Sequence, residues 1–231
     1  MRRHPLPLVA CTAFSMAIGN AHAQNLDYRE METIFGEPVT TSVTGSPQRV
    51  SDVPAAMTII TAEQISRAAA VDIPGILREY TDLDVLQFAR GDSEVSVRGY
   101  DKAVSSRLLV LINDRQVYLD NRGFTDWQSL PVQLSEIRQI EVVKGPNSAL
   151  FGFNASGGVV NIVTANPMYD SVNTMTVRAG SNGYKETSVV GTAPIGTMGG
   201  LRLSAGGFDA SNFPTNSLWE GPGSVTSIRN W

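Results

Sequence analysis

The chain has 231 residues, of which 42% are hydrophobic and 17% are charged, and its formal net charge is −4. This composition is sufficient to bury a hydrophobic core, so it argues against a disordered chain and favours one or two folded domains. The excess of acidic residues argues against nucleic acid as a partner, because nucleic-acid-binding domains carry basic surfaces.

The first 23 residues have the pattern of a secretory signal peptide. Two arginines precede an apolar run over residues 6–18, and the Ala21-His22-Ala23 tripeptide forms a small-x-small cleavage site. The alternative is a lipoprotein signal with Cys11 as the lipidated residue, but the apolar stretch before Cys11 is too short for it. We therefore predict that residues 1–23 are removed on export.

Removal of the signal peptide takes away both histidines and the single cysteine, and it leaves 16 basic against 22 acidic residues, a net charge of −6. Without His or Cys, a zinc site of the usual kind, a Ser-His or Cys-His catalytic pair and a disulfide framework are all unavailable. This argues against most hydrolytic and redox enzymes. We expect no catalytic residues, no metal site, no cofactor and no enzymatic activity. No later apolar run reaches the ~18 residues of a membrane-spanning helix, so any membrane crossing would use strands.

The mature chain begins with a polar, aperiodic stretch over residues 24–48. Within it, residues 39–44 form a β-prone run that Gly45 and Pro47 close. We predict an extended and exposed segment. The unpaired backbone groups of such a segment either join a partner sheet or stay solvated, and the local pattern alone favours a simple linker.

Compact structure is predicted from Val53 onward. Residues 57–60 form a short apolar strand, and Thr61 begins a capping box for a helix. In a second helix Asp72 is the expected N-cap and Pro74 lies in the first turn, where its missing N–H does no harm. The expected core face of this second helix comprises Ile73, Ile76, Leu77 and Tyr80.

Strand and helix signals then alternate, which predicts a mixed α+β domain. The Asn113-Asp114 pair is expected to turn the chain between two strands of a hairpin. Gly145-Pro146 should stop a later strand abruptly. The expected strands are residues 84–87, 94–98, 108–112, 115–118, 140–144 and 159–164, with a short helical stretch over residues 130–136.

After Pro167 the pattern changes to long alternating segments separated by glycine turns. These segments cover residues 174–180, 184–192 and 200–206, and we expect a loop after Phe208. Alternation over about 10 positions is the weak signature of a transmembrane β-barrel, with one face to lipid and one to the lumen. Soluble antiparallel sheets give the same pattern.

Four ordered sequence pieces resemble the plug domain of TonB-dependent outer-membrane receptors. They are V-S-V-R-G at residues 95–99, L-L-V-L-I-N-D at 108–114, E-V-V-K-G-P at 141–146 and S-A-L-F-G-F-N-A-S-G-G-V-V-N-I-V-T at 148–164. The resemblance implies a receptor of about 22 strands whose lumen the plug fills, in the outer membrane, with the plug facing the barrel lumen and the periplasm. It divides the chain into a signal peptide (1–23), a periplasmic extension (24–49), a plug (50–167) and the first strands of an incomplete barrel (168–231).

The resemblance also implies partners and site residues. The energy-coupling protein TonB would pair by strand addition with a TonB box ahead of the plug. Barrel strands would contact outer-membrane lipid, and the transported ligand would be a small molecule or a metal chelate. The TonB box is expected at Glu37, Pro38, Val39, Thr40, Thr41, Ser42, Val43 and Thr44.

Two further sets of residues follow from the family pattern. Basic plug residues of this family pair with acidic residues of the barrel wall, and Arg98 and Lys144 occupy the matching positions. Lysine at the second position makes a weaker lock than arginine, because it lacks the planar bidentate geometry. Loops at the plug apex would contribute ligand contacts from Arg90, Asn121 and Arg122.

The implied function is active uptake of a scarce ligand such as a ferric siderophore or cobalamin. The alternatives are a soluble periplasmic binding module made of the plug alone and a nonfunctional piece of a broken receptor gene. A complete barrel requires several hundred residues beyond Pro167, so we expect the chain to be either a fragment of a longer receptor or the product of a truncated gene.

Overall fold

The computed structural model describes residues 28–43, 46–89, 91–98, 107–117, 124–181, 183–196, 199–211 and 227–230. The predicted signal peptide lies outside these residues. Among the described residues, no helix is both long and apolar enough to cross a membrane.

A five-stranded mixed sheet forms the centre of the first domain, called the sheet domain below. Its strand order is β3 (Ala56–Thr61), β8 (Ile137–Lys144), β9 (Gly158–Thr164), β6 (Leu108–Ile112) and β7 (Arg115–Gln116). The β6–β9 pair is parallel and the other pairs are antiparallel. The predicted hairpin turn is present, with positive φ at Asn113 and Asp114, as tight hairpin turns require.

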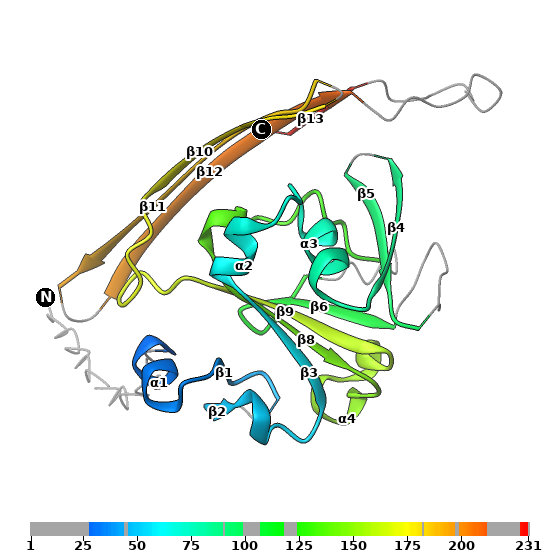
Figure 1. Cartoon of the computed structure of the whole chain (residues 1–231), viewed down its shortest axis with the longest axis vertical. Helices are drawn as coiled ribbons and strands as arrows, with labels where there is room; N and C mark the ends of the chain where they lie inside the picture. The colour runs from blue at the N-terminus through cyan, green and yellow to red at the C-terminus, as the bar shows by residue number, and fades with distance from the viewer. Residues whose placement is uncertain are drawn as a thin grey trace, which may run out of the picture.

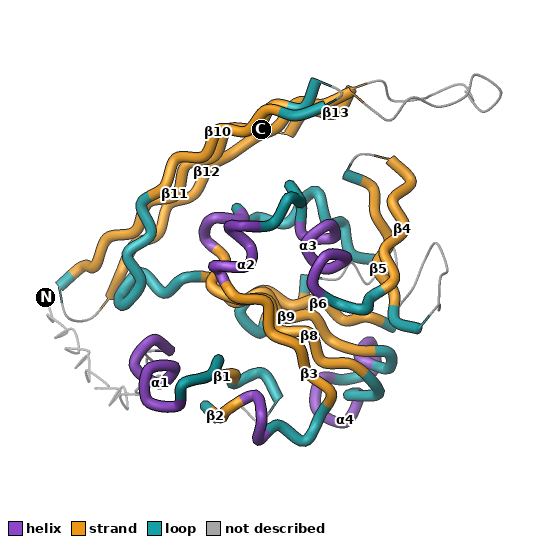
Figure 2. Tube along the Cα trace, viewed as in Figure 1, coloured by secondary structure: helices purple, strands orange, loops and turns teal. Residues whose placement is uncertain are grey.

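Each face of this sheet carries its own apolar cluster. On one face Ile140, Val142, Val160 and Ile162 are fully buried, under the helices α2 (Ala62–Arg67) and α3 (Ile73–Tyr80) and the hairpin β4 (Asp84–Ala89) and β5 (Asp92–Ser96). The other face carries Leu109, Leu111, Val143 and Val159. Helical segments therefore lie on both sides of the sheet (Figure 2).

The two predicted helices begin at their predicted caps. The Thr61 side chain accepts from Gln64 N while the Gln64 side chain accepts from Thr61 N, which completes the capping box of α2. In α3 the Asp72 carboxylate accepts from Gly75 N at 2.7 Å, and Pro74 lies in the first turn. The expected core residues Ile73, Ile76 and Leu77 are buried, and Tyr80 packs partly against them.

The cap of α3 gives a test of local stability. Asp72→Ala should lower the free energy of unfolding by about 1 kcal/mol, because the first-turn N–H groups lose their acceptor. Urea denaturation followed by circular dichroism measures this change. Glu79→Ala, on the exposed last turn of the same helix, should change it by less than about 0.5 kcal/mol. Equal effects of the two substitutions would contradict the capping role.

The amino-terminal stretch differs from the prediction. The stretch before Gly36 is expected to be aperiodic, yet α1 (Tyr28–Phe35) is a helix. The β-prone run is extended as predicted at β1 (Val39–Thr40), and β2 (Gln48–Arg49) and the 3-10 turn η1 (Val50–Asp52) follow it. The predicted exposure of the segment after Pro38 is wrong, because Val39 and Thr40 are fully buried. Figure 1 shows these elements on the side of the sheet away from α2 and α3.

Other departures have local causes. The helix expected at residues 130–136 is reduced to the 3-10 turn η2 (Leu134–Glu136), since Pro131 disfavours helical geometry at Leu130.

The glycines near the short helices α4 (Ser148–Phe151) and η3 (Phe153–Ala155) have two roles. Gly152 turns the chain with φ of 89°, whereas a Cβ at Gly158 would lie 2.8 Å from Val143 O, so close strand packing requires that glycine.

A second, antiparallel sheet follows the sheet domain and is called the wall sheet. Its strands are β10 (Thr174–Ala179), β11 (Lys185–Ile195), β12 (Gly199–Ser211) and β13 (Ser227–Asn230), in that order. The prediction of a loop from Phe208 onward is therefore wrong in two places. Strand β12 continues to Ser211, and residues 227–230 form β13, which pairs with β12. The wall sheet curves past the side of the sheet domain that carries α2 and α3 (Figure 1).

Candidate functional site: a docked segment and the junction with the wall sheet

The segment predicted to bind a partner lies against the sheet domain. Val39 is fully buried, and Val43, at 6% exposure, packs with Leu109, Leu111 and Val143. Backbone pairing contributes little to this docking: β1 pairs with β2 through two residue pairs, Val39 with Arg49 and Thr40 with Gln48. The docked residues of the segment are therefore held mainly by side chains.

A buried carboxylate at the middle of β8 is the main polar partner of the segment. The side chain of Glu141 is fully buried. Its Oε2 accepts hydrogen bonds from Thr40 Oγ1 at 2.9 Å and from Ser42 Oγ, and its Oε1 accepts from Gln139 Nε2 at 2.6 Å. A buried carboxylate is tolerated only when hydrogen bonds satisfy it, and here two of its donors come from the segment.

Two amide side chains complete this arrangement, and we call Gln139, Glu141 and Asn161 the Glu141 cluster. Gln139 Nε2 also donates to Val39 O at 2.9 Å. Asn161 is paired with Glu141 across β8 and β9, and its Nδ2 donates to Ser42 Oγ at 2.7 Å and to Asp114 Oδ1 at 2.9 Å. All three members of the cluster are at most 2% exposed.

The charge of Glu141 is under opposing influences. Burial raises the pKa of its carboxyl group above the ordinary value, and this is the largest effect. The hydrogen bonds from Ser42, Gln139 and Thr40 act to lower the pKa, while the negative charge of Asp114 acts to raise it. The net direction is upward, so burying this carboxylate carries a cost that the segment's hydroxyl groups partly offset.

An arginine on β8 joins α1 to the chain that leads into the wall sheet. Arg138 is 11% exposed; its Nη1 lies 2.8 Å from Asp170 Oδ1 and its Nη2 lies 3.1 Å from Glu32 Oε2. Asp170 also accepts from Asn166 N at 2.9 Å. Arg138 of β8 therefore contacts both the helix that precedes the sheet domain and the chain that follows it.

A second buried carboxylate connects the sheet domain to the wall sheet. Glu136 is 1% exposed, and its Oε2 lies 3.0 Å from Arg202 Nε of β12. Arg202 Nη1 also donates to Thr164 Oγ1 at 2.6 Å and to Ala165 O at 2.7 Å. Ser204 Oγ donates to Glu136 Oε1 at 3.2 Å. In this ion pair the arginine belongs to the wall sheet and the glutamate belongs to the sheet domain.

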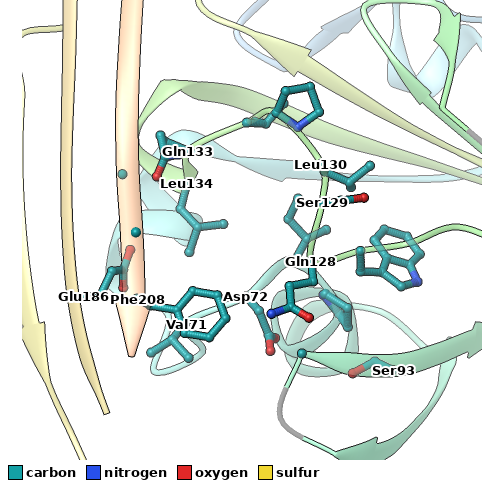
Figure 3. Close-up of a pocket in the computed structure, with 18 of the residues that line it drawn as sticks. Val71, Asp72, Ser93, Gln128, Ser129, Leu130, Gln133, Leu134, Glu186 and Phe208 are labelled. Carbon is teal, nitrogen blue, oxygen red and sulfur yellow. The ribbon is translucent and has the colours of Figure 1, made fainter. Parts of the chain in front are cut away.

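A cavity of about 400 Å³ lies next to this junction. Asp72, Gln128 and Leu130 line it from the sheet domain, and Glu186 and Phe208 line it from the wall sheet (Figure 3). Gly206 lies close to Gln133 at this junction: a Cβ at that position would lie 2.4 Å from Gln133 Oε1, so the Gln133 side chain would have to move. The wall sheet and the sheet domain therefore pack against each other with a hollow between them.

Comparison with known proteins identifies the family. The model of the TonB-dependent receptor plug domain matches residues 49–159. Residues 49–159 belong to the TonB-dependent receptor plug domain family. The sheet domain is thus the plug, and the resemblance inferred from the four sequence pieces is confirmed.

Curated relatives agree with this assignment. The vitamin B12 transporter BtuB of Photobacterium profundum is 33% identical over 165 residues, which is 70% of this chain and 26% of that protein. BtuB of Vibrio vulnificus is 28% identical over 203 residues, or 87% of this chain and 31% of that protein. The chain therefore spans roughly a quarter to a third of the length of these relatives. The names of the relatives describe transporters rather than enzymes.

Solved structures share the fold. The ferripyoverdine receptor of the outer membrane of Pseudomonas aeruginosa superposes with a TM-score of 0.57 at 14% identity, over 76% of this chain and 23% of that one. The ferric-catecholate import receptor Fiu from E. coli K12 superposes with a TM-score of 0.54 at 22% identity, over 72% and 23%. The predicted fold class, an α+β plug with a mixed sheet followed by antiparallel strands, is confirmed.

The two predicted lock residues lie near each other but have different surroundings. Arg98 lies just beyond β5, is exposed and has φ of 56°. Lys144 ends β8, and its Nζ lies 2.7 Å from Asp82 Oδ1 within the plug. The hydrogen bond from Lys144 is the main reason that the pKa of Asp82 is lowered. Pairing of Arg98 and Lys144 with acidic residues of the barrel wall stays a prediction.

The predicted ligand contacts Arg90, Asn121 and Arg122 lie outside the described residues, as does Thr44 of the predicted TonB box. Gly91, next to Arg90 in sequence, lines the cavity at the wall sheet. These four assignments, and the domain boundaries at residues 23, 49 and 167, stay predictions.

The sequence pattern did not identify the residues that bind the segment to the sheet domain or those that join the sheet domain to the wall sheet. A signal was present for two of them: Glu141 interrupts the apolar run of β8, and Asn161 interrupts that of β9. Polar residues inside buried strands are uncommon and require partners. Glu136 and Arg202 gave no such signal. Glu136 follows Ser135 in a short turn, and Arg202 occupies a polar position of an alternating strand, where a charged side chain is ordinary.

Proposed function

We propose that this chain acts in TonB-dependent uptake across the outer membrane, with residues 37–44 as the segment that TonB engages. The observation that carries this proposal is the position and state of that segment. It precedes the plug, its β-prone backbone makes only two residue pairs with β2, and side chains hold it on the face of the plug sheet opposite α2 and α3. Such a segment can leave the plug and join another sheet by its backbone.

The ligand class that fits the proposal is a scarce cobalamin-like or ferric-siderophore-like compound. It rests on the relatives, which are named as vitamin B12 transporters, and on the solved structures, which are named as receptors for iron chelates. The cavity between the plug and the wall sheet offers hydrogen-bonding groups and an aromatic ring on one surface, which suits a polar chelate with apolar parts.

The wall sheet supports a membrane location over a soluble plug-only module. Alternate residues point to its outer face, and this face carries large exposed apolar side chains. They are Met175, Val177, Val189, Ile195, Leu201 and Leu203, each between 47% and 72% exposed. The inner face carries Glu186, Ser188, Arg202 and Ser204 toward the plug. An apolar outer face and a polar inner face are the arrangement that a lipid-facing strand requires.

Binding of TonB tests the proposal directly. The purified chain should bind the periplasmic part of TonB, and deletion of residues 37–44 should abolish binding because the added strand is lost. Deletion of residues 28–35, which removes α1 instead, is the matched control and should leave binding detectable. Unchanged binding after the first deletion would overturn the assignment of the TonB box.

Lipid contact gives a second test. Leu203→Arg should lower the fraction of the chain that floats with phospholipid vesicles, because an arginine on a lipid-facing strand costs about 2–4 kcal/mol near the bilayer midplane. Lys185→Arg, at the end of β11, should leave this fraction unchanged. If Leu203→Arg floats as well as the parent chain, this face does not contact lipid.

A further inference from the structure

We propose that the Glu141 cluster controls access to the TonB-binding segment: its buried carboxylate holds the segment on the plug through the hydroxyl groups of Thr40 and Ser42. This inference rests on the proposed function, since it concerns the regulation of the same segment. Glu141 is a positioning residue here, because it acts on the partner only through the segment that it holds.

The contacts of the segment with the plug are unlike those of a strand in a sheet. Its two hydroxyl groups donate to one oxygen of Glu141, and Gln139 donates to its backbone at Val39 O. Asn161 donates to the same Ser42 hydroxyl, which places that hydroxyl between an amide donor and a carboxylate acceptor. Hydrogen bonds to a charged group are stronger than those between neutral groups, so these contacts dominate the polar part of docking.

Docking and strand addition exclude each other. In the docked state Val39 and Thr40 are fully buried, Val43 is 6% exposed, and β1 is paired with β2. A partner that adds a strand requires an exposed backbone edge and room for the alternate side chains. The segment must therefore leave the plug first, which withdraws two donors from a buried carboxylate. The cost of this withdrawal sets the fraction of segments available to the partner.

The two interactions have different sequence requirements. Docking uses the hydroxyl groups at positions 40 and 42, whereas strand addition uses the backbone and tolerates any β-prone side chain. Thr40→Val combined with Ser42→Ala removes both hydroxyl groups and keeps every backbone N–H and C=O group of the segment. This double variant should therefore release the segment without damaging its ability to join another sheet.

Thiol labelling measures release in the chain itself. In a Cys11→Ser background the chain has no other cysteine, so Val43→Cys provides a single buried reporter. Adding Thr40→Val and Ser42→Ala should raise the rate of maleimide labelling at position 43 by about tenfold or more, since two charge-assisted hydrogen bonds are lost. Glu141→Gln, which keeps the shape but removes the charge, should raise the rate in the same direction.

A second reporter separates release from general loosening. Ala155 is fully buried in the same apolar cluster as Val43, but it belongs to η3 rather than to the segment. Ala155→Cys should be labelled at the same slow rate with and without the Thr40→Val and Ser42→Ala changes. An unchanged rate at position 43, or an equal increase at position 155, would overturn the proposal.

Binding of the periplasmic part of TonB to the same variants distinguishes this inference from the proposed function. If the double variant is labelled faster and binds TonB more tightly, both stand. Faster labelling with no TonB binding by any variant supports the control of the segment and overturns the proposed function. Equal labelling with normal TonB binding overturns the control by Glu141 and leaves the proposed function in place.

Discussion

Replacing Arg202 with methionine is expected to lower the free energy of unfolding by about 3 kcal/mol. The substitution keeps much of the length and apolar surface of the side chain but leaves Glu136, at 1% exposure, without its ion-pair partner. Removing one member of a buried pair typically costs 3–5 kcal/mol, because an uncompensated charge remains. The lower end applies because Arg202 keeps 26% of its side chain exposed. Thr164 and Ala165 lose a donor as well.

Urea denaturation followed by circular dichroism measures this change. Combining Arg202→Met with Glu136→Gln should restore part of the stability, since the amide can still accept from Gln133 N and Ser204 Oγ without a buried charge. Arg67→Met is the matched control: its ion pair with Glu63 is about 70% exposed, so its loss should cost less than about 1 kcal/mol. Equal costs for Arg202→Met and Arg67→Met would show that the buried ion pair at the junction stabilises the fold no more than an exposed ion pair does.

Replacing Thr41 with proline should weaken TonB binding by at least about tenfold. Proline lacks the backbone N–H that an added strand donates, and it is tolerated in sheets mainly at edges and strand starts. Loss of one ladder hydrogen bond together with local distortion corresponds to about 1.4 kcal/mol or more, which is a factor of ten in affinity. The docked state should change less, because proline at this position leaves both β1–β2 residue pairs intact.

The matched control for this prediction is Thr41→Val, which keeps the N–H and the β-propensity. Calorimetric titration of each purified variant with the periplasmic part of TonB measures the affinities. Thr41→Val should bind like the parent chain. If the proline and valine variants bind equally well, residues 37–44 do not pair with TonB as a strand and act as a linker.

Features that depend on neighbouring residues were predicted well from the sequence. The capping box at Thr61, the N-cap at Asp72 and the turn at Asn113-Asp114 all have the expected geometry. Each is determined by hydrogen bonds or backbone preferences within about four residues, so the sequence contains all the partners. Strand alternation after Pro167 likewise gave the positions of three strands of the wall sheet, though not their full lengths.

Features that depend on distant partners were not predicted. The segment after Pro38 was expected to be exposed, but its hydroxyl groups meet Glu141, which is 101 residues from Thr40 and 99 from Ser42. Arg202 was not recognised as a contact, because its partner Glu136 lies in another sheet. Lys144 was matched to the barrel wall by family position, whereas its described partner is Asp82 of the plug itself.

The sequence by itself determined the plug, because its helices, turns and buried strands follow from local periodicity and from motifs that stand in order along the chain. Only the tertiary structure decided how the segment after Pro38 is docked and which charged groups meet at the junction between the plug and the wall sheet. In both cases the deciding groups are buried carboxylates, Glu141 and Glu136, on or next to strand β8. A carboxylate can be buried only where the fold brings donors to it, and which donors arrive is a property of three-dimensional packing.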